Sequence, residues 1–169
     1  MLIVMNKLLP IVGFAFFSLV STTVFSKDFD YQNETVGALK IGLTEEQVAK
    51  AVPLKFKRGP SQLMGADGKY HQEWVNAQSG VTLDMTSESK AGAKTIESIT
   101  IKPPCTWATS RGIRINSTAE EVRKAYKAEI NKTESKSSSG LVIGSLFGGL
   151  VTEIKDGKVV GLFVGAASE

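Results

Sequence analysis

The sequence has few of the residues from which catalytic and metal-binding sites are usually built. Its 169 residues include a single cysteine, Cys105, and a single histidine, His71. One cysteine cannot form an internal disulfide, so an ordinary apolar core must stabilise the fold. A zinc site needs three or four closely spaced ligands, mostly His and Cys, and these two residues lie far apart in the chain. We therefore expect no metal, no cofactor and no disulfide-bonded scaffold.

The chain also lacks an excess of charge of either sign. It carries 20 Lys and Arg against 17 Asp and Glu, a net charge of +3, and both signs are spread along the sequence. Nucleic acids and anionic membranes are bound by clustered Lys and Arg. The nearest approach to such a cluster, between Arg111 and Lys127, is interrupted by Glu120 and Glu121 and is typical of a solvated helix face. The charge pattern therefore argues against a nucleic-acid-binding protein.

Long hydrophobic runs are missing except near the start of the chain. There, a basic residue precedes an apolar stretch at 8–20, and small and polar residues follow it, which is the order of a secretory signal peptide. A membrane-spanning helix needs roughly 20 apolar residues, and this run is shorter and contains a proline and a glycine. We therefore expect residues 1–26 to be a cleaved signal peptide. The remainder would be periplasmic or secreted, without stable insertion in a membrane.

The most informative feature that is present is an internal repeat. Residues 39–52 resemble residues 113–126. Both segments contain an isoleucine, a threonine, a pair of glutamates, a valine and a Lys-Ala pair in the same order. Thr44 and Thr118 stand where a helix N-cap is expected, and the Gln or Glu three residues later completes a capping box. The repeat therefore predicts two short amphipathic helices that begin after these threonines.

Each predicted helix is followed by segments with the alternation of β-strands. Gly148-Gly149 and Asp156-Gly157 are typical two-residue hairpin turns. The sequence predicts an α+β fold of two tandem related units, 27–104 and 105–169, each a helical segment packed on an antiparallel β-meander. The expected strands span residues 70–75, 81–86 and 95–102 in the first unit and 141–147, 150–155 and 158–164 in the second.

The last expected strand of each unit has an interrupted alternation. Its apolar residues are separated by three positions and then by two. Strict alternation is broken once by this spacing, which predicts a β-bulge at the same place in both strands. The residues concerned are Ile96, Ile99 and Ile101 in the first unit and Val159, Leu162 and Val164 in the second.

A helix followed by a meander, in tandem and in an exported chain, resembles the β-lactamase inhibitor protein fold. It is also similar to the BamE/SmpA-type small lipoproteins of the outer-membrane assembly machinery. The resemblance implies a non-enzymatic module that binds protein partners with the open face of a sheet and its loops. The chain would then be an inhibitor of, or an accessory to, another envelope or secreted protein. The residues that carry the resemblance are 41–48, 115–122, the segment Asp156-Gly157-Lys158-Val159, Leu162 and Val164.

The candidate partner-binding surface lies on two of the expected strands. Alternation places Tyr70, Gln72 and Trp74 on one face of the first strand, and Thr82 and Asp84 form the polar set of the second. If both sets share a face, they form an exposed patch with the Tyr and Trp anchors typical of protein interfaces. If the aromatic residues lie with the apolar set of the second strand, they belong to the core, which we favour for Trp74.

His71 is the basis of an alternative function, a small periplasmic ligand-binding or hydrolase-like domain. Asp84 or Glu73 could orient the imidazole toward a serine, but the sequence has no nucleophile-elbow pattern. A lone histidine on a strand is more often exposed or satisfied, so we expect no enzymatic activity. A third alternative is a structural component of the envelope that forms a homodimer through a sheet edge or Cys105.

Overall fold

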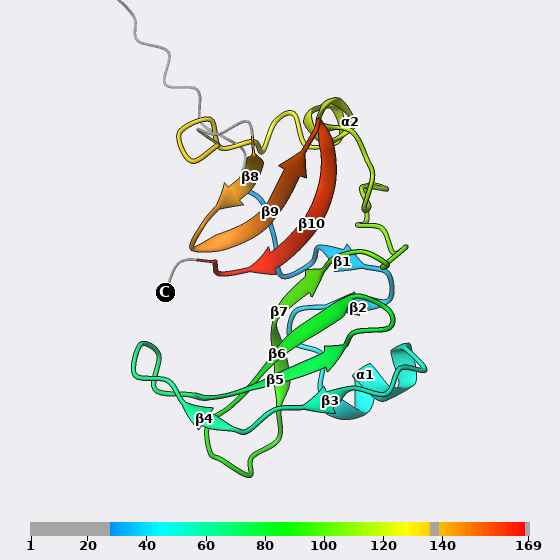
Figure 1. Ribbon diagram of the computed structural model, residues 1–169. Coiled ribbons are helices and arrows are strands. Elements are labelled where there is room, and N and C mark those ends of the chain that lie inside the picture. The colour runs from blue at the N-terminus through cyan, green and yellow to red at the C-terminus, as the bar shows by residue number, and fades with distance from the viewer. Residues whose placement is uncertain (1–27, 136–138, 168–169) are drawn as a thin grey trace, which may run out of the picture.

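The structure, a computed structural model, describes residues 28–135 and 139–167. The predicted signal peptide at residues 1–26 lies outside the described residues. The main element of the fold is one eight-stranded sheet in which all pairings are antiparallel (Figure 1). A separate two-stranded ribbon is formed by β1, Thr35–Val36, and β2, Leu39–Lys40.

The large sheet has the order β3-β5-β6-β7-β10-β9-β8, and β4 pairs with β5 beside β3. All six strands predicted from alternation are present, with slightly different bounds, as β5 to β10. The strands span Lys57–Arg58 (β3), Gln62–Leu63 (β4), Tyr70–Asn76 (β5), Val81–Ser87 (β6), Thr95–Ile101 (β7), Gly140–Ser145 (β8), Gly148–Lys155 (β9) and Lys158–Gly165 (β10).

Two helices of seven residues each begin at the predicted caps: α1, Glu45–Ala51, and α2, Ala119–Ala125. In α1 the N–H of Gln47 donates to Thr44 Oγ1 at 3.3 Å, and the N–H of Thr44 donates to Gln47 Oε1 at 2.9 Å. The same reciprocal pair forms at the start of α2. Both predicted capping boxes are therefore confirmed.

The predicted pair of β-bulges is also confirmed. In β7, Ser98 pairs with Asp84 and Ile96 pairs with Met85, which leaves Glu97 as the extra residue. In β10 the register against β9 shifts between Val159 and Gly161. Each extra residue shifts the alternation by one position, so that the apolar residues on both sides of the bulge point to the same face of the sheet. The spacing of these apolar residues in the sequence predicted this shift.

The predicted fold class, two tandem α+β units, is wrong. The described chain is sheet-dominated and its two helices are short, and the strands form one large antiparallel sheet instead of two helix-plus-meander units. The strands of the two halves join where β7 pairs with β10, through Ile101 with Leu162 and Ile99 with Val164. Pairing these two strands satisfies backbone groups that two separate meanders would leave at exposed edges. The domain boundary predicted after residue 104 lies in the loop beyond β7 and stays a prediction.

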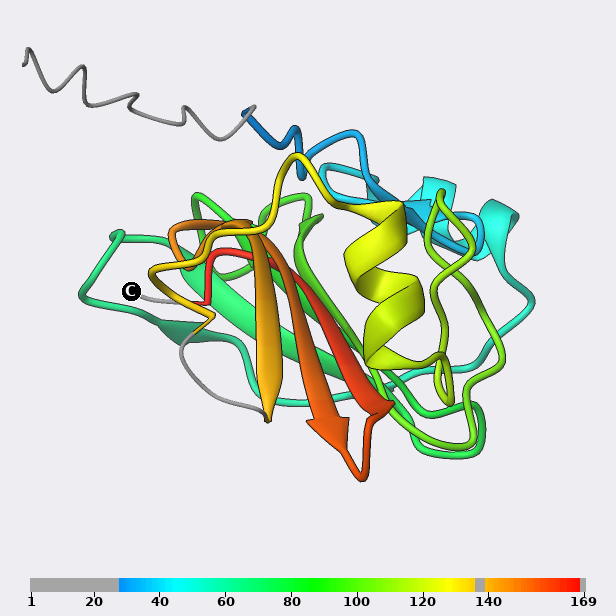
Figure 2. The same ribbon diagram turned by 90° about the horizontal axis from the view of Figure 1, so that it is seen from above.

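The core lies on one face of the sheet. Val48 of α1, Val122 of α2 and Val36 of β1 are buried in the same cluster as the side chains of this face. Figure 2 shows α2 lying against this side of β8, β9 and β10. We call it the covered face. Its central row, one residue from each of six neighbouring strands, is Trp74, Leu83, Ile99, Val164, Leu150 and Ile143.

Candidate functional site

The opposite face of the sheet, here called the open face, is the candidate functional surface. Both described helices pack on the covered face, so the open face keeps side chains that are only half-buried. Each residue of its central row is the chain neighbour of a residue in the buried row, because side chains alternate between the two faces of a sheet. The row is Val75, Thr82, Thr100, Phe163 and Val151, in the order of the strands β5, β6, β7, β10 and β9.

The chain closes this row at the β8 end. Val142, the next residue in the row, is buried. Its N–H donates to Ser135 Oγ at 2.8 Å, and its carbonyl accepts from Asn131 N–H at 2.8 Å. These contacts satisfy the outer edge of β8, which is a common protection against edge-to-edge pairing.

Two hollows lie along the open face and share Thr100 and Lys102. One, of about 410 Å³, is lined by Val75, Thr82 and the loop after β5. The other, of about 360 Å³, is lined by Phe163, Val151 and neighbouring residues of β9 and β10.

A glycine keeps the floor of the second hollow open. Gly161 pairs with Glu153 on β9, and a Cβ at Gly161 would lie 3.0 Å from Glu153 Oε2. Lys102 and Glu153 form an ion pair of 3.9 Å above this floor, with side chains 63% and 61% exposed. An exposed pair at this distance contributes little to stability, so both charges remain available to a partner.

His71 lies at one end of the open face between two carboxylates. Its Nδ1 is 2.6 Å from Asp84 Oδ2 on β6, and its Nε2 is 3.1 Å from Asp67 Oδ2 in the turn before β5. Burial lowers the pKa of His71, but the hydrogen bonds and charges of Asp67 and Asp84 outweigh it and raise the pKa above its ordinary value. The pKa of Asp67 is lowered, first by the N–H of Lys69 and then by His71.

This geometry differs from that of a hydrolytic triad. A triad histidine uses one ring nitrogen for a carboxylate and the other for the nucleophile's hydroxyl. Both ring nitrogens of His71 face carboxylates. The imidazole is therefore placed to hold two acids rather than to take a proton from a hydroxyl group.

The structure does not bring the five predicted site residues together. Tyr70, Gln72 and Trp74 share the covered side of β5, whereas Thr82 and Asp84 lie on the open face. Of the two alternatives left open by alternation, the register corresponds to the second: the aromatic set shares a face with the apolar side chains of β6. A role of these five residues in partner binding stays a prediction.

Trp74 is only 3% exposed and lies opposite Leu83. Its Nε1–H donates to Gln72 Oε1 at 3.0 Å, and the guanidinium carbon of Arg58 lies 3.8 Å from its ring centre. The side chain is thus held by apolar packing, a hydrogen bond and a cation–π contact. Its place is that of a core residue near the sheet edge.

Sequence reasoning did not include Thr100, Lys102 and Phe163 among the site residues. The available signal was the position of Phe163 between the apolar Leu162 and Val164, because alternation then places it on the opposite face. What could not be read from alternation is that β10 lies beside β7. That pairing brings Phe163 opposite Thr100 and makes the row continuous.

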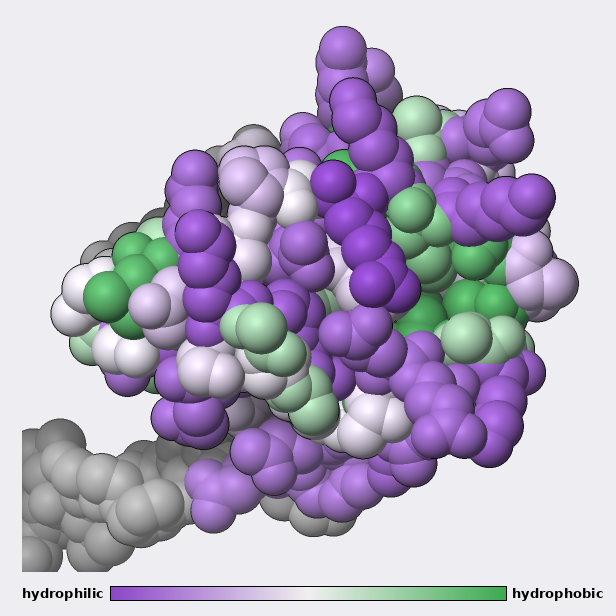
Figure 3. Space-filling view, turned by 90° about the horizontal axis from the view of Figure 1, so that it is seen from below, coloured by the Kyte–Doolittle hydropathy of each residue, from purple (hydrophilic) through white to green (hydrophobic). Residues whose placement is uncertain are grey.

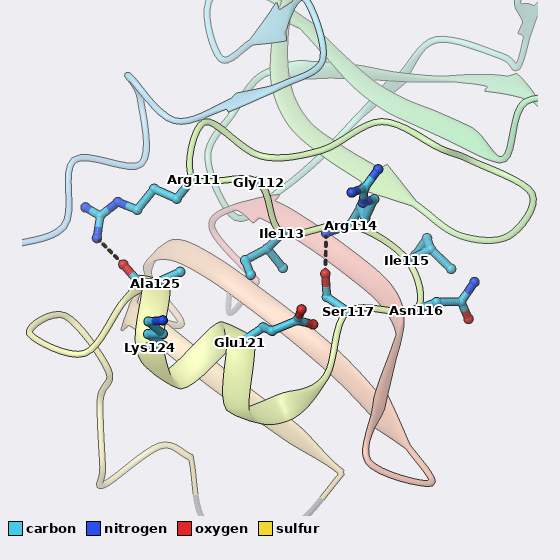
Figure 4. Close-up of a pocket in the computed structure, with 10 residues that line it drawn as sticks. All are labelled: Arg111, Gly112, Ile113, Arg114, Ile115, Asn116, Ser117, Glu121, Lys124 and Ala125. Atoms are coloured by element: carbon cyan, nitrogen blue, oxygen red, sulfur yellow. Dashed lines mark hydrogen bonds between the residues drawn. The ribbon is translucent and has the colours of Figure 1, made fainter.

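A further hollow of about 580 Å³ lies between α2 and residues 111–117 (Figure 4). Arg111 extends to the C-terminal end of α2, where it donates to the Ala125 carbonyl at 2.9 Å, and it pairs with Glu129 at 3.0 Å. Glu121 is held by the backbone and hydroxyl of Thr118, which lower its pKa. Since two of its four charged lining residues, Arg111 and Glu121, are engaged within the fold, we interpret this hollow as a space left between packed elements.

Large hydrophobic side chains are exposed at few places in the described residues. They are Leu63 and Met64 in the β4–β5 hairpin and Phe147 in the β8–β9 turn. Figure 3 shows the molecule from below as mostly hydrophilic, with hydrophobic surface confined to small separate areas. The described part of the chain thus presents scattered apolar residues rather than one broad apolar patch.

No family model, curated protein or solved structure matches the chain. The resemblance to the β-lactamase inhibitor and BamE/SmpA-type proteins therefore stays a hypothesis from sequence. Within residues 28–135 and 139–167, none of the helices has the length and apolar character needed to cross a membrane.

Proposed function

We propose that the protein is an exported, non-enzymatic protein-binding module of the bacterial cell envelope, and that its binding surface is the open face. The observation that carries the proposal is the difference between the two faces. Both helices and the N-terminal ribbon pack on one face, while the other keeps a row of half-buried side chains across five strands. A face of this kind is available to a partner.

The size of the open face suits a protein partner. Five strands at a spacing of about 4.8 Å span roughly 20 Å, and protein interfaces of standard size bury about 800 Å² on each side. Phe163 supplies an aromatic anchor, Thr82 and Thr100 supply hydroxyl groups, and Lys102 and Glu153 supply charges of both signs. This mixture is typical of an interface with an apolar centre and a polar rim.

The environment of His71 supports a binding role over a hydrolytic one. An acid–base catalyst needs a ring nitrogen within reach of the reacting group. In the structure the partners of the two nitrogens are Asp84 and Asp67, and neither partner is a hydroxyl nucleophile. We therefore assign His71 to the local structure of the open face and propose that the chain has no enzymatic activity.

The order of residues in 1–26 supports export, so the partner belongs to the periplasm or the medium. The partner would be an envelope or secreted protein that the chain inhibits or assists. The even charge balance favours neither a nucleic acid nor an anionic membrane.

The test is affinity capture from envelope and secreted fractions with residues 27–169 as bait, followed by measurement of Kd for the captured protein. The binding variants are Phe163→Ser and Lys102→Glu, which change the centre and the rim of the open face. The matched control is Lys124→Glu, the same change of charge on α2. Circular dichroism and thermal unfolding establish that each bait is folded.

We expect each open-face variant to weaken binding by about tenfold or more, the effect of a residue worth at least 1.4 kcal/mol. The Lys124→Glu control should bind as the wild type does. Unchanged binding in both open-face variants, or equal weakening in all three, would show that the open face is not the binding surface. A folded bait that captures no specific partner would contradict the binding function itself.

A further inference from the structure

The turn between β4 and β5, residues 64–69, is here called the clamp turn. Figure 1 shows it at one end of the sheet, away from both helices. The N–H of Met64 donates to the Lys69 carbonyl at 2.8 Å, and the N–H of Gly68 donates to the Met64 carbonyl at 3.1 Å. These bonds lie within the hairpin itself. The contact between Asp67 and His71 ties the tip of the turn to β5.

His71 joins three elements through one ring. The ring belongs to β5, Asp84 belongs to β6 and Asp67 belongs to the clamp turn. The His71 side chain is only 12% exposed. The imidazole is therefore largely shielded from water, whereas the Asp67 carboxylate is open to it.

Both contacts can be hydrogen bonds at the same time only if the ring carries two protons. An ionised carboxylate only accepts, and a neutral imidazole donates from one nitrogen and accepts at the other. Near neutral pH, aspartates are ordinarily ionised. The arrangement of two carboxylates on one ring therefore requires the imidazolium, whichever tautomer the neutral ring would adopt.

The surrounding charges favour the same state. Glu73 lies opposite Asp84 across the β5–β6 pair. Glu97, the bulge residue of β7, accepts from Thr86 Oγ1 at 3.2 Å and lies 3.7 Å from the Lys69 ammonium. Of these groups, only the carboxylates of Asp67 and Asp84 contact the ring, and both raise its pKa. Their summed charge is negative and stabilises a cation.

Loss of one proton affects the two contacts differently. Asp84 is fixed in the middle of β6 and lies at the shorter distance, 2.6 Å, so the remaining N–H should stay with it. Asp67 would then face the lone pair of Nε2, and an attraction would become a repulsion. Asp67 belongs to an exposed turn and is otherwise held by the N–H of Lys69, at 3.0 Å from its Oδ1, within the same turn, so Asp67 and Lys69 can move away together.

We infer that His71 is a pH-dependent clamp: its imidazolium holds the clamp turn against the sheet, and loss of one proton releases the turn. Leu63 and Met64, 59% and 41% exposed, lie at the base of this turn. Release of the turn would therefore change the position of these two exposed apolar side chains on the surface. The inference concerns the conformation of the turn and does not depend on whether the open face binds a partner.

The first test is an NMR titration of the imidazole, which needs no assignment because the chain has one histidine. The pKa of His71 should lie above its ordinary value of about 6.5. Asp67→Asn and Asp84→Asn should each lower it, whereas Asp156→Asn, in the exposed turn between β9 and β10, should leave it unchanged. A wild-type pKa at or below the ordinary value would overturn the clamp, as would the absence of any effect of Asp67→Asn.

The second test is amide hydrogen exchange of residues 64–69 at pH values below and above the measured pKa, corrected for intrinsic exchange rates. Loss of a charge-assisted hydrogen bond should speed exchange in the clamp turn by about tenfold or more above the pKa. The Asp156-Gly157 turn serves as the internal control. In His71→Gln the clamp turn should exchange rapidly at both pH values. Equal protection of the wild-type turn on both sides of the pKa would contradict release.

Discussion

The two faces of the sheet use neighbouring residues of the same strands and differ in what they contact. Ile99 lies in the covered row and is fully buried, while Thr100, the next residue, lies in the open row and is half-buried. Leu162 and Phe163 differ in the same way on β10. The two residues compared in each case lie on the same strand and pair with the same neighbouring strands. The difference in burial therefore arises from what packs against each face.

The comparison shows that a residue can favour a β-strand without contributing to the core. Threonine, valine and phenylalanine favour strands on either face, because they fit a pleated and partly buried surface. The open row therefore supports the sheet without contributing much to the core. A chain that only needed stability could cover this row, and leaving it uncovered is what supports a binding role.

The largest expected difference is between truncations in the two rows. Ile99→Ala removes a fully buried side chain and should lower the free energy of unfolding by about 2–5 kcal/mol. Thr100→Ala, one residue along, should lower it by about 0.5 kcal/mol or less, as is usual for positions without core contacts. Urea unfolding followed by circular dichroism measures both. Similar losses in the two variants would mean that the open row is packed as tightly as the covered one.

The sequence was sufficient for the helix caps and the bulges, which depend on local chemistry. The hairpin turn predicted at Gly148-Gly149 was wrong, because both glycines belong to β9 and the turn is formed by residues 146–147. Thr44 and Thr118 were predicted as caps because capping involves residues three positions apart. The bulges at Glu97 and before Gly161 followed from a break in alternation within one strand. In each case the residues that decide the structure are neighbours in the chain.

Features that depend on long-range pairing were not predicted. Nothing in the local pattern indicates that β7 pairs with β10, which turned two expected meanders into one sheet. The register of β5 on β6 was also open, and it separates Trp74 from Thr82 by placing them on opposite faces. The meeting of His71 with Asp67 was also not foreseen, although the two are only four residues apart, because it depends on the conformation of the turn between them.

The two faces should also differ in how the free energy of unfolding depends on pH, and this difference should be smaller than that between the two truncations. The folded pKa of His71 is raised, so its stabilising contribution is complete below the unfolded value of about 6.5 and is lost as pH rises through the folded pKa. The lowered pKa of Asp67 acts in the opposite sense, since its contribution is lost as acid protonates it. Stability should therefore decline from about pH 6 toward pH 8.

Urea unfolding at several pH values between about 5.5 and 8 measures this decline, which lies within the ordinary range of histidine titration. Burial raises the pKa of the Cys105 thiol and of the Tyr126 hydroxyl, so both stay neutral in this range and the covered face contributes no slope. His71→Gln should remove the decline. A decline of the same size in His71→Gln would assign it to another group and not to the clamp.

The smallest expected effect on stability comes from the ion pair at the rim of the open face. Lys102 and Glu153 are both well exposed and 3.9 Å apart, so Lys102→Met, Glu153→Gln and the double variant should each change the free energy of unfolding by less than about 1 kcal/mol. A double-mutant cycle from urea unfolding at low and high salt measures their coupling, which salt should reduce. If the coupling is this weak and Lys102→Glu still abolishes partner binding, the charge serves recognition and not the fold. A coupling of several kcal/mol would instead make the pair part of the structure and remove it from the proposed interface.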